Sequence, residues 1–239
     1  MALYNRDYID AHNKSLEKEI VKEAPREEKL DRATFIKKTY QLFAASLMAA
    51  TAGAYIGMDM AASIADWYWG LVILEFLLLF GIYFTKSKPG INLIMLFAFT
   101  FMTGITLTPL LSAVLGMPGG ASIVTNALLL TGVAFGGISL FAINTKRDFT
   151  FMGKFLFIAL IIMIVAALIN IFLGSPILQL AIASAGALLF SAFILFDTQN
   201  IMRGNFSSPV EAAIALYLDV LNLFISLLQI MGLLGSSED

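Results

Sequence analysis

The chain contains seven long apolar segments, and this pattern restricts its fold more than any other feature. A run of about 20 apolar residues forms a helix long enough to cross the hydrocarbon core of a bilayer. Hydrophobic residues make up 59% of the 239-residue chain and charged residues only 13%, whereas soluble domains contain about 25% charged residues. The sequence therefore predicts an all-α integral membrane protein built as a bundle of seven transmembrane helices. We place the spans near residues 35–57, 67–85, 91–115, 121–143, 153–173, 177–202 and 209–234.

The apolar segments divide the chain into two parts. Residues 1–34 form a polar, charge-rich tail, and residues 35–239 form the seven-span transmembrane domain. Lys and Glu alternate in the tail, a pattern typical either of a solvated helix with spaced ion pairs or of a disordered segment. The connections between the spans are short, so we expect no inserted soluble domain.

The positions of the cations predict how the chain is oriented. Cytoplasmic loops carry an excess of Lys and Arg. All 15 Lys and Arg residues lie in the N-terminal tail, near the start of span one, or in and beside the connections that follow spans two, four and six. In a seven-span arrangement these positions share one side of the membrane. We therefore expect a cytoplasmic N-terminus and a C-terminus on the opposite side, although an even number of spans would place both ends in the cytoplasm.

Three carboxyl groups lie deep within the predicted spans, where an ionisable residue costs about 2.5–3.5 kcal/mol on insertion scales. They are Glu75, Asp197 and Asp219. Glu75 lies about 16 Å from the predicted cytoplasmic end of its span, near the middle of the membrane. It is either a protonated residue that is hydrogen-bonded to a neighbouring helix or a residue that lines a path for ions or protons.

Asp197 and Asp219 lie on the two sides of the connection between spans six and seven. From the helical rise we place them about 9 and about 16 Å from that connection. The depths nearly match if span seven begins one turn later, so the two carboxyl groups could meet; the alternative is two separately satisfied polar residues. A close pair in low dielectric cannot easily lose both protons, so it would titrate as a unit and act as a proton switch. The ionised pair would also offer oxygen ligands that suit Ca²⁺.

Two sequence elements resemble those of a known family. One is the Gly-Ile-Thr-Leu-Thr-Pro element at residues 104–109, and the other is the Leu-Tyr-Leu-Asp-Val-Leu-Asn-Leu-Phe element at residues 216–224, together with Phe196-Asp197. With these elements, residues 30–239 resemble the Bax inhibitor family, also called transmembrane Bax inhibitor motif proteins, in its bacterial type. The resemblance implies a seven-helix bundle with the last helix near its centre. It also implies that the protein lies in the bacterial inner (plasma) membrane.

The resemblance further implies a pH-sensitive cation leak, chiefly for Ca²⁺, in which aspartates on helices six and seven form the sensor. Those aspartates match Asp197 and Asp219. A basic residue at the inner end of helix two can pair with them in one gating state; Lys86 holds that place, with Lys88 nearby. Glu75 also fits the family pattern and would line the ion path. Some bacterial relatives instead restrain an ATP-dependent membrane protease, which implies a protease as a partner.

The sequence leaves three functions open and argues against others. The protein is a cation channel, a proton-coupled cation exchanger, or a membrane regulator of a protease or stress response that transports nothing; the carboxyl pair favours the channel. We expect no enzyme, because cysteine is absent, the single His12 lies in the tail and the glycines of a membrane aspartyl protease do not precede Asp219. We expect no cofactor apart from Ca²⁺ as the transported or bound ion. The expected partners are the lipid bilayer, Ca²⁺ and protons, without nucleic acid.

Overall fold

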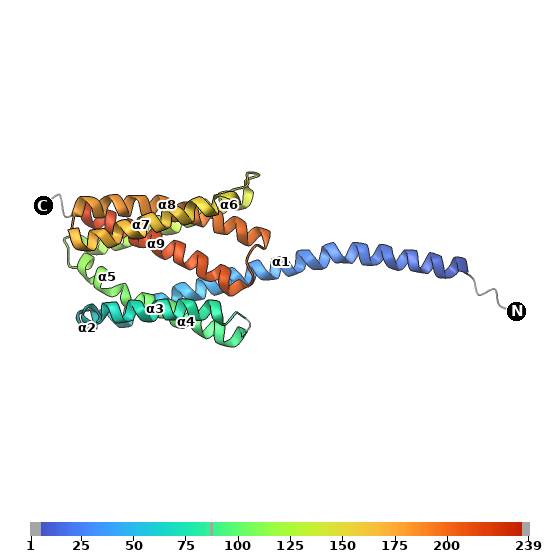
Figure 1. Cartoon of the computed structure of the whole chain (residues 1–239), viewed down its shortest axis with the longest axis horizontal. Helices are drawn as coiled ribbons and strands as arrows, with labels where there is room; N and C mark the ends of the chain where they lie inside the picture. The colour runs from blue at the N-terminus through green and yellow to red at the C-terminus, as the bar shows by residue number, and fades with distance from the viewer. Residues whose placement is uncertain (1–5, 87, 236–239) are drawn as a thin grey trace.

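The computed structural model of the chain describes residues 6–86 and 88–235, and the side chains from residue 31 onward. Every regular element in the described residues is helical, and most of the helices are gathered in one bundle (Figure 1). The elements are α1 (Arg6–Met58), α2 (Ala61–Asp66), α3 (Tyr68–Phe84), α4 (Pro89–Thr106), α5 (Thr108–Leu115), α6 (Gly120–Asn144), the 3-10 helix η1 (Thr150–Met152), α7 (Gly153–Leu173), α8 (Pro176–Arg203) and α9 (Pro209–Gly235).

Six stretches of the structure are long and apolar enough to cross a membrane. They are Asp31–Met58, Pro89–Leu115, Gly120–Asn144, Thr150–Leu173, Pro176–Arg203 and Pro209–Gly235. The prediction of an all-helical, multi-pass membrane protein is therefore confirmed. The remaining predicted span, near residues 67–85, corresponds to α3, an apolar helix of 17 residues. Its length of about 26 Å is slightly less than the thickness of the hydrocarbon core.

The predicted third span is broken into two helices. α4 ends at Thr106 and α5 begins at Thr108, with Leu107 between them. Pro109 has no backbone N–H and its ring would collide with the preceding turn, so a continuous helix cannot pass through this position without distortion. Thr106 is therefore the last residue of α4, and its side chain is partly buried.

α1 is one continuous helix of 53 residues, about 80 Å long at the usual helical rise. The predicted boundary near residue 34 is therefore not a break in secondary structure. The C-terminal part of α1 packs against α4 and α9. Its N-terminal part projects from one end of the bundle (Figure 1).

The bundle has two distinct ends. The α3–α4, α6–α7 and α8–α9 connections lie at the end from which α1 projects, whereas the α5–α6 and α7–α8 connections and the last turn of α9 lie at the other end (Figure 1). The described cations outside α1 all belong to the first set of connections or to the helix turns beside them. Their grouping at one end agrees with the arrangement expected from the charge pattern.

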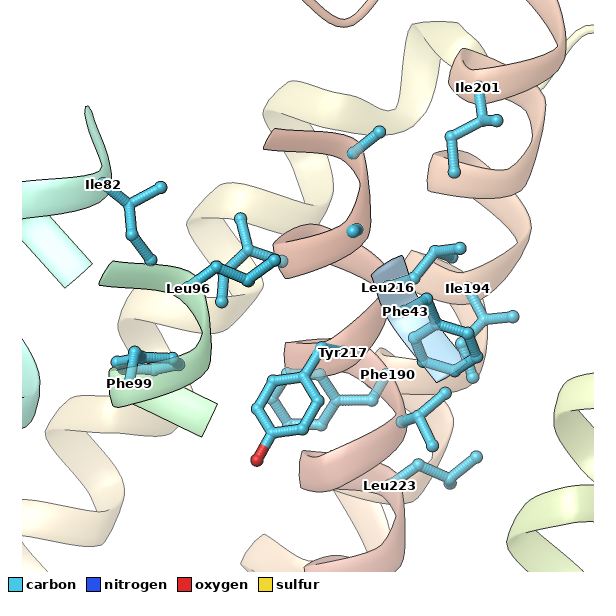
Figure 2. Close-up of a cluster of buried hydrophobic side chains, with 14 residues drawn as sticks. Phe43, Ile82, Leu96, Phe99, Phe190, Ile194, Ile201, Leu216, Tyr217 and Leu223 are labelled. Atoms are coloured by element: carbon cyan, nitrogen blue, oxygen red, sulfur yellow. The ribbon is translucent and has the colours of Figure 1, made fainter. Parts of the chain in front are cut away.

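α9 contributes most to the interior. It packs against α1, α4, α6 and α8, and half of its most apolar stretch is buried, compared with 11% for the stretch that includes α7. Figure 2 shows the main cluster, in which Leu216 and Tyr217 of α9 meet Phe43 of α1, Leu96 of α4 and Ile194 of α8. The outer faces of the helices expose large apolar side chains in numbers typical of lipid contact.

Candidate functional site

The structure places Asp197 of α8 and Asp219 of α9 together inside the bundle. Both side chains are buried, with residue exposures of 8% and 5%, and their carboxyl groups lie within hydrogen-bonding reach of each other. When both carboxyls are ionised, Asp219 Oδ2 has no hydrogen-bond donor among the described residues. A proton held between the two carboxyls would satisfy this atom, because a protonated carboxyl donates where an ionised one only accepts.

The α8–α9 hairpin brings the two aspartates to a common depth. α8 ends at Arg203, and Gly204 follows with a φ of 73°, a left-handed conformation that glycine adopts without steric cost. Asn205 donates its backbone N–H to the carbonyl of Asn200 at 2.9 Å and its side-chain amide to the Asn200 side chain, also at 2.9 Å. This tight reversal lets α9 return along α8, so that residues on either side of the connection face each other.

Glu75 lies in a separate pocket of about 560 Å³. Its carboxylate accepts a hydrogen bond from the Thr106 hydroxyl at the end of α4. Polar side chains from α4 and α9 also line this pocket, among them Thr103, Asn222 and Gln229, whereas Asp197 and Asp219 are not among its lining residues. The structure therefore holds Glu75 and the aspartate pair as two polar sites within one bundle.

Tyr217 lies between the polar groups of α4 and the core. Its hydroxyl shares a hydrogen bond with the Thr103 hydroxyl and reaches the carbonyl oxygen of Thr100 at 3.3 Å. Its ring packs edge-on against Phe99. The residue exposure of Tyr217 is 0%, and its hydroxyl contacts Thr103, which lines the Glu75 pocket.

Lys86 contacts an acidic residue other than the predicted aspartates. Its Nζ lies 2.8 Å from a carboxylate oxygen of Glu211, in the first turn of α9, and 4.8 Å from the centre of the Tyr83 ring. Lys88 is exposed immediately before α4 and makes no ion pair with a described side chain. The pairing of either lysine with Asp197 and Asp219 in another gating state stays a prediction.

The described residues contain no cluster of three or more His, Cys, Asp or Glu side chains that could hold a metal ion. Asp197 and Asp219 thus form a pair without a third acidic ligand. Ca²⁺ in proteins takes six to eight oxygen ligands, so two carboxyls supply only part of a site.

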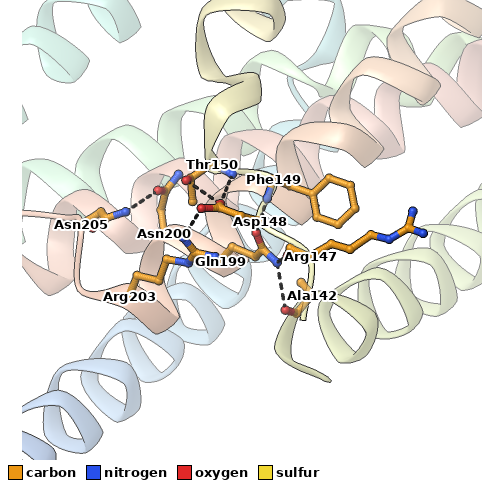
Figure 3. Close-up of polar contacts among 9 residues, drawn as sticks. All are labelled: Ala142, Arg147, Asp148, Phe149, Thr150, Gln199, Asn200, Arg203 and Asn205. Carbon is orange, nitrogen blue, oxygen red and sulfur yellow. Dashed lines mark hydrogen bonds and ion pairs between the residues drawn. The ribbon is translucent and has the colours of Figure 1, made fainter. Parts of the chain in front are cut away.

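Residues near the C-terminal end of α8 form a polar cluster that the sequence did not reveal (Figure 3). Gln199 accepts a hydrogen bond from the Phe149 N–H at 2.8 Å and donates to the Arg147 carbonyl at 2.9 Å. Asp148 pairs with Arg203 at 2.6 Å. Hydrogen bonds from the Thr150 hydroxyl and amide, followed by that from Arg203, lower the pKa of Asp148 to about 2. The partners of Gln199 and of Arg203 are about 50 residues away in the sequence, so no local motif marks these contacts.

Comparisons with known proteins agree with this architecture. Residues 32–236 match the family model described as Inhibitor of apoptosis-promoting Bax1. An uncharacterized protein of Campylobacter jejuni is 52% identical over 235 residues, which are 97% of each chain. An uncharacterized membrane protein of Vibrio cholerae is 41% identical over 216 residues, 89% of this chain and 95% of the relative. The Escherichia coli protein named Modulator of FtsH protease YccA is 36% identical over 155 residues, 65% of this chain and 70% of that protein.

The family match and the fold lead to the same assignment. The matched region contains every candidate membrane span almost completely, together with the aspartate pair and Glu75. The relatives match over most of their own length as well. The chain is therefore a member of the Bax inhibitor family.

Proposed function

We propose that this protein is a pH-sensitive cation leak for Ca²⁺, gated by protonation of Asp197 and Asp219. The observation that carries the proposal is the burial of two adjacent carboxyl groups on α8 and α9. With one proton between them, the carboxyls hold the two helices together. Without it, two negative charges repel each other in a medium of low dielectric, and the helices separate or take up a cation.

The proposed conducting unit is a bundle of seven spans. α3 would cross the membrane as the seventh span, since it is apolar throughout and packs along α4. α9 would form the centre of the bundle, because it contacts four other long helices. Glu75 would then offer a carboxylate to cations within the membrane, in the pocket between α3, α4 and α9. Lys86 would stabilise one gating state by moving from Glu211 to the aspartates.

Ca²⁺ entry into liposomes that contain the purified protein tests this proposal. The leak predicts that Ca²⁺ enters down its own gradient, without a pH gradient, and faster than into empty liposomes. A proton-coupled exchanger would move Ca²⁺ against its gradient when a pH gradient is imposed. An entry rate equal to that of empty liposomes, both with and without a pH gradient, would overturn both forms of transport.

A second function is regulation of a membrane protease. The support comes from the E. coli relative, which is named a modulator of FtsH protease, and from the part of α1 that extends beyond the bundle. That helix would offer a cytoplasmic handle to a partner. Deletion of residues 1–30 should then change the turnover of the protease's substrates while leaving Ca²⁺ entry intact. Unchanged turnover, with no protease in the purified material, would count against this role.

The proposed location is the bacterial inner membrane. The N-terminus and the connections that carry cations would lie in the cytoplasm, as the bias of Lys and Arg toward that side requires. The C-terminal end of α9 would then lie on the opposite side. In this orientation the α8–α9 connection beside the aspartate pair would face the cytoplasm, so the switch would respond to cytoplasmic pH.

A further inference from the structure

The segment that joins α6 to α7 is basic and exposed. Lys146 and Arg147 follow the end of α6, and Lys154 lies in the first turn of α7. All three residues are exposed, and none forms an ion pair with a described side chain. The only carboxyl group in the segment, Asp148, is paired with Arg203. A net positive charge therefore remains on its outer surface.

The backbone of this segment is fixed to α8. The side-chain amide of Gln199 bonds to the Phe149 N–H and the Arg147 carbonyl. Asp148 accepts hydrogen bonds from the amide and hydroxyl of Thr150, at 2.8 and 2.7 Å. A Cβ added at Gly153 would lie only 2.8 Å from the ring of Phe196, so the start of α7 sits directly on α8. The cations are therefore carried on a constrained backbone, which reduces the entropy lost when a ligand binds.

The side chains of the segment face two ways. The side chain of Asp148 lies within the hydrogen-bonded cluster, as does that of Gln199 from α8, whereas the guanidinium of Arg147 extends away from it (Figure 3). Phe151 and Phe155 lie between and beside the cations and are 77% and 69% exposed. Exposed aromatic rings next to Lys and Arg are typical of the boundary between lipid headgroups and acyl chains. The segment also lies at the end of the bundle where the other cations gather (Figure 1).

We propose that the α6–α7 connection is a binding site for the headgroup of an anionic phospholipid. Arg147, Lys146 and Lys154 would contact the phosphate group, and Phe151 and Phe155 would lie among the upper parts of the acyl chains. In the proposed orientation this connection would face the cytoplasmic leaflet. Charge complementarity then favours an anionic lipid, because that leaflet carries a negative surface potential. The site is independent of the proposed cation leak, since it requires neither Asp197 nor Asp219.

A fluorescence experiment in reconstituted vesicles tests the site. Trp67→Phe, Trp69→Phe and Phe151→Trp together would give the full chain a single tryptophan in the connection. Brominated phosphatidylglycerol and brominated phosphatidylcholine, each added at increasing fractions to phosphatidylcholine vesicles, would quench that tryptophan according to their local occupancy. We expect phosphatidylglycerol to occupy the site in preference to phosphatidylcholine. The ratio of the two occupancies should fall by about fivefold for each cation removed in Lys146→Gln/Arg147→Gln.

The matched control is Lys37→Gln/Lys38→Gln, which removes two exposed cations from α1. This control should keep the preference within about twofold, because its charges do not lie in the connection. Gln199→Leu should reduce the preference without changing the charge, since it removes the amide that fixes the backbone. Equal quenching by the two lipids, or equal losses in the two double variants, would overturn a local site.

Discussion

Individual carboxyl groups in this chain have opposite environments. Asp148 is more than half exposed and accepts hydrogen bonds from Thr150 and Arg203. Asp219 is buried, and one of its oxygens has no donor among the described residues unless Asp197 carries a proton. The first carboxyl is therefore satisfied as an anion, whereas the second depends on its neighbour. This difference separates a carboxylate held by fixed donors from a buried carboxyl that lacks them.

The contacts of Asp148 predict a pH dependence of stability. Its pKa in the folded protein is about 2, below the ordinary value of 3.8. A lowered pKa means that the carboxylate stabilises the fold above pH 3.8 and that this contribution is lost as the pH falls toward 2. The melting temperature of Asp148→Asn in detergent should be lower than that of the wild type at neutral pH, and the gap should close in acid. A difference in melting temperature that does not vary with pH would contradict this assignment. The control is Asp66→Asn, an exposed site at the other end of the bundle.

The sequence allowed part of the site to be predicted at this scale. The helical rise indicated that Asp197 and Asp219 could meet, because both lie close to one short connection. The contact between Lys86 and Glu211 was not predicted, since it depends on where the α3–α4 connection lies relative to α9. Gln199 was also missed, because its partners are backbone groups of a distant segment whose position only the packing of α7 on α8 determines.

Among the elements, α1 and α4 pack especially closely. A Cβ added at Gly104 of α4 would overlap the backbone of Ala50, and one added at Gly53 of α1 would overlap the backbone of Phe101. Small residues let membrane helices approach in this way. The apolar runs predicted where these helices lie but not this contact. The break at Leu107 was missed as well, although Pro109 stands in the sequence, because prolines also occur within continuous membrane helices.

The close packing of α1 and α4 predicts the effect of a single methyl group. Gly104→Ala should destabilise the protein by about 1–3 kcal/mol, since the added Cβ meets rigid backbone rather than a flexible side chain. Gly132→Ala in α6 is the matched control, because a Cβ there meets nothing within 4 Å, and it should be neutral or slightly stabilising. Thermal unfolding in detergent measures both variants. Equal melting temperatures for the two would show that α1 and α4 are not held together at this point.

The molecule as a whole is polarised along its long axis. The projecting part of α1 and the connections that carry cations lie at one end, and the last turn of α9 lies at the other (Figure 1). This arrangement requires α3 to run the length of the bundle between Asp66 and Lys88. Whether the chain crosses the membrane at α3 therefore decides the orientation of every element that precedes it.

The chain contains no cysteine, so single introduced cysteines can report this orientation. Asp66→Cys and Lys88→Cys place exposed thiols before and after α3. A maleimide that cannot cross membranes should label Asp66→Cys in cells whose inner membrane is intact. It should label Lys88→Cys only after that membrane is opened. Labelling of both thiols in intact cells, or of neither, would show that α3 does not cross the bilayer.

The most direct test of the proposed gate is the pH profile of Ca²⁺ entry into liposomes. Asp197→Asn and Asp219→Asn each replace one carboxyl of the pair with a neutral amide of similar shape, and Asp59→Asn, an exposed site, is the control. The wild type and the control should change their entry rates between about pH 6 and about pH 8, as a shared proton is gained or lost. Both pair variants should give rates that no longer depend on pH. Pair variants that follow the wild-type profile would contradict the assignment of the gate to Asp197 and Asp219.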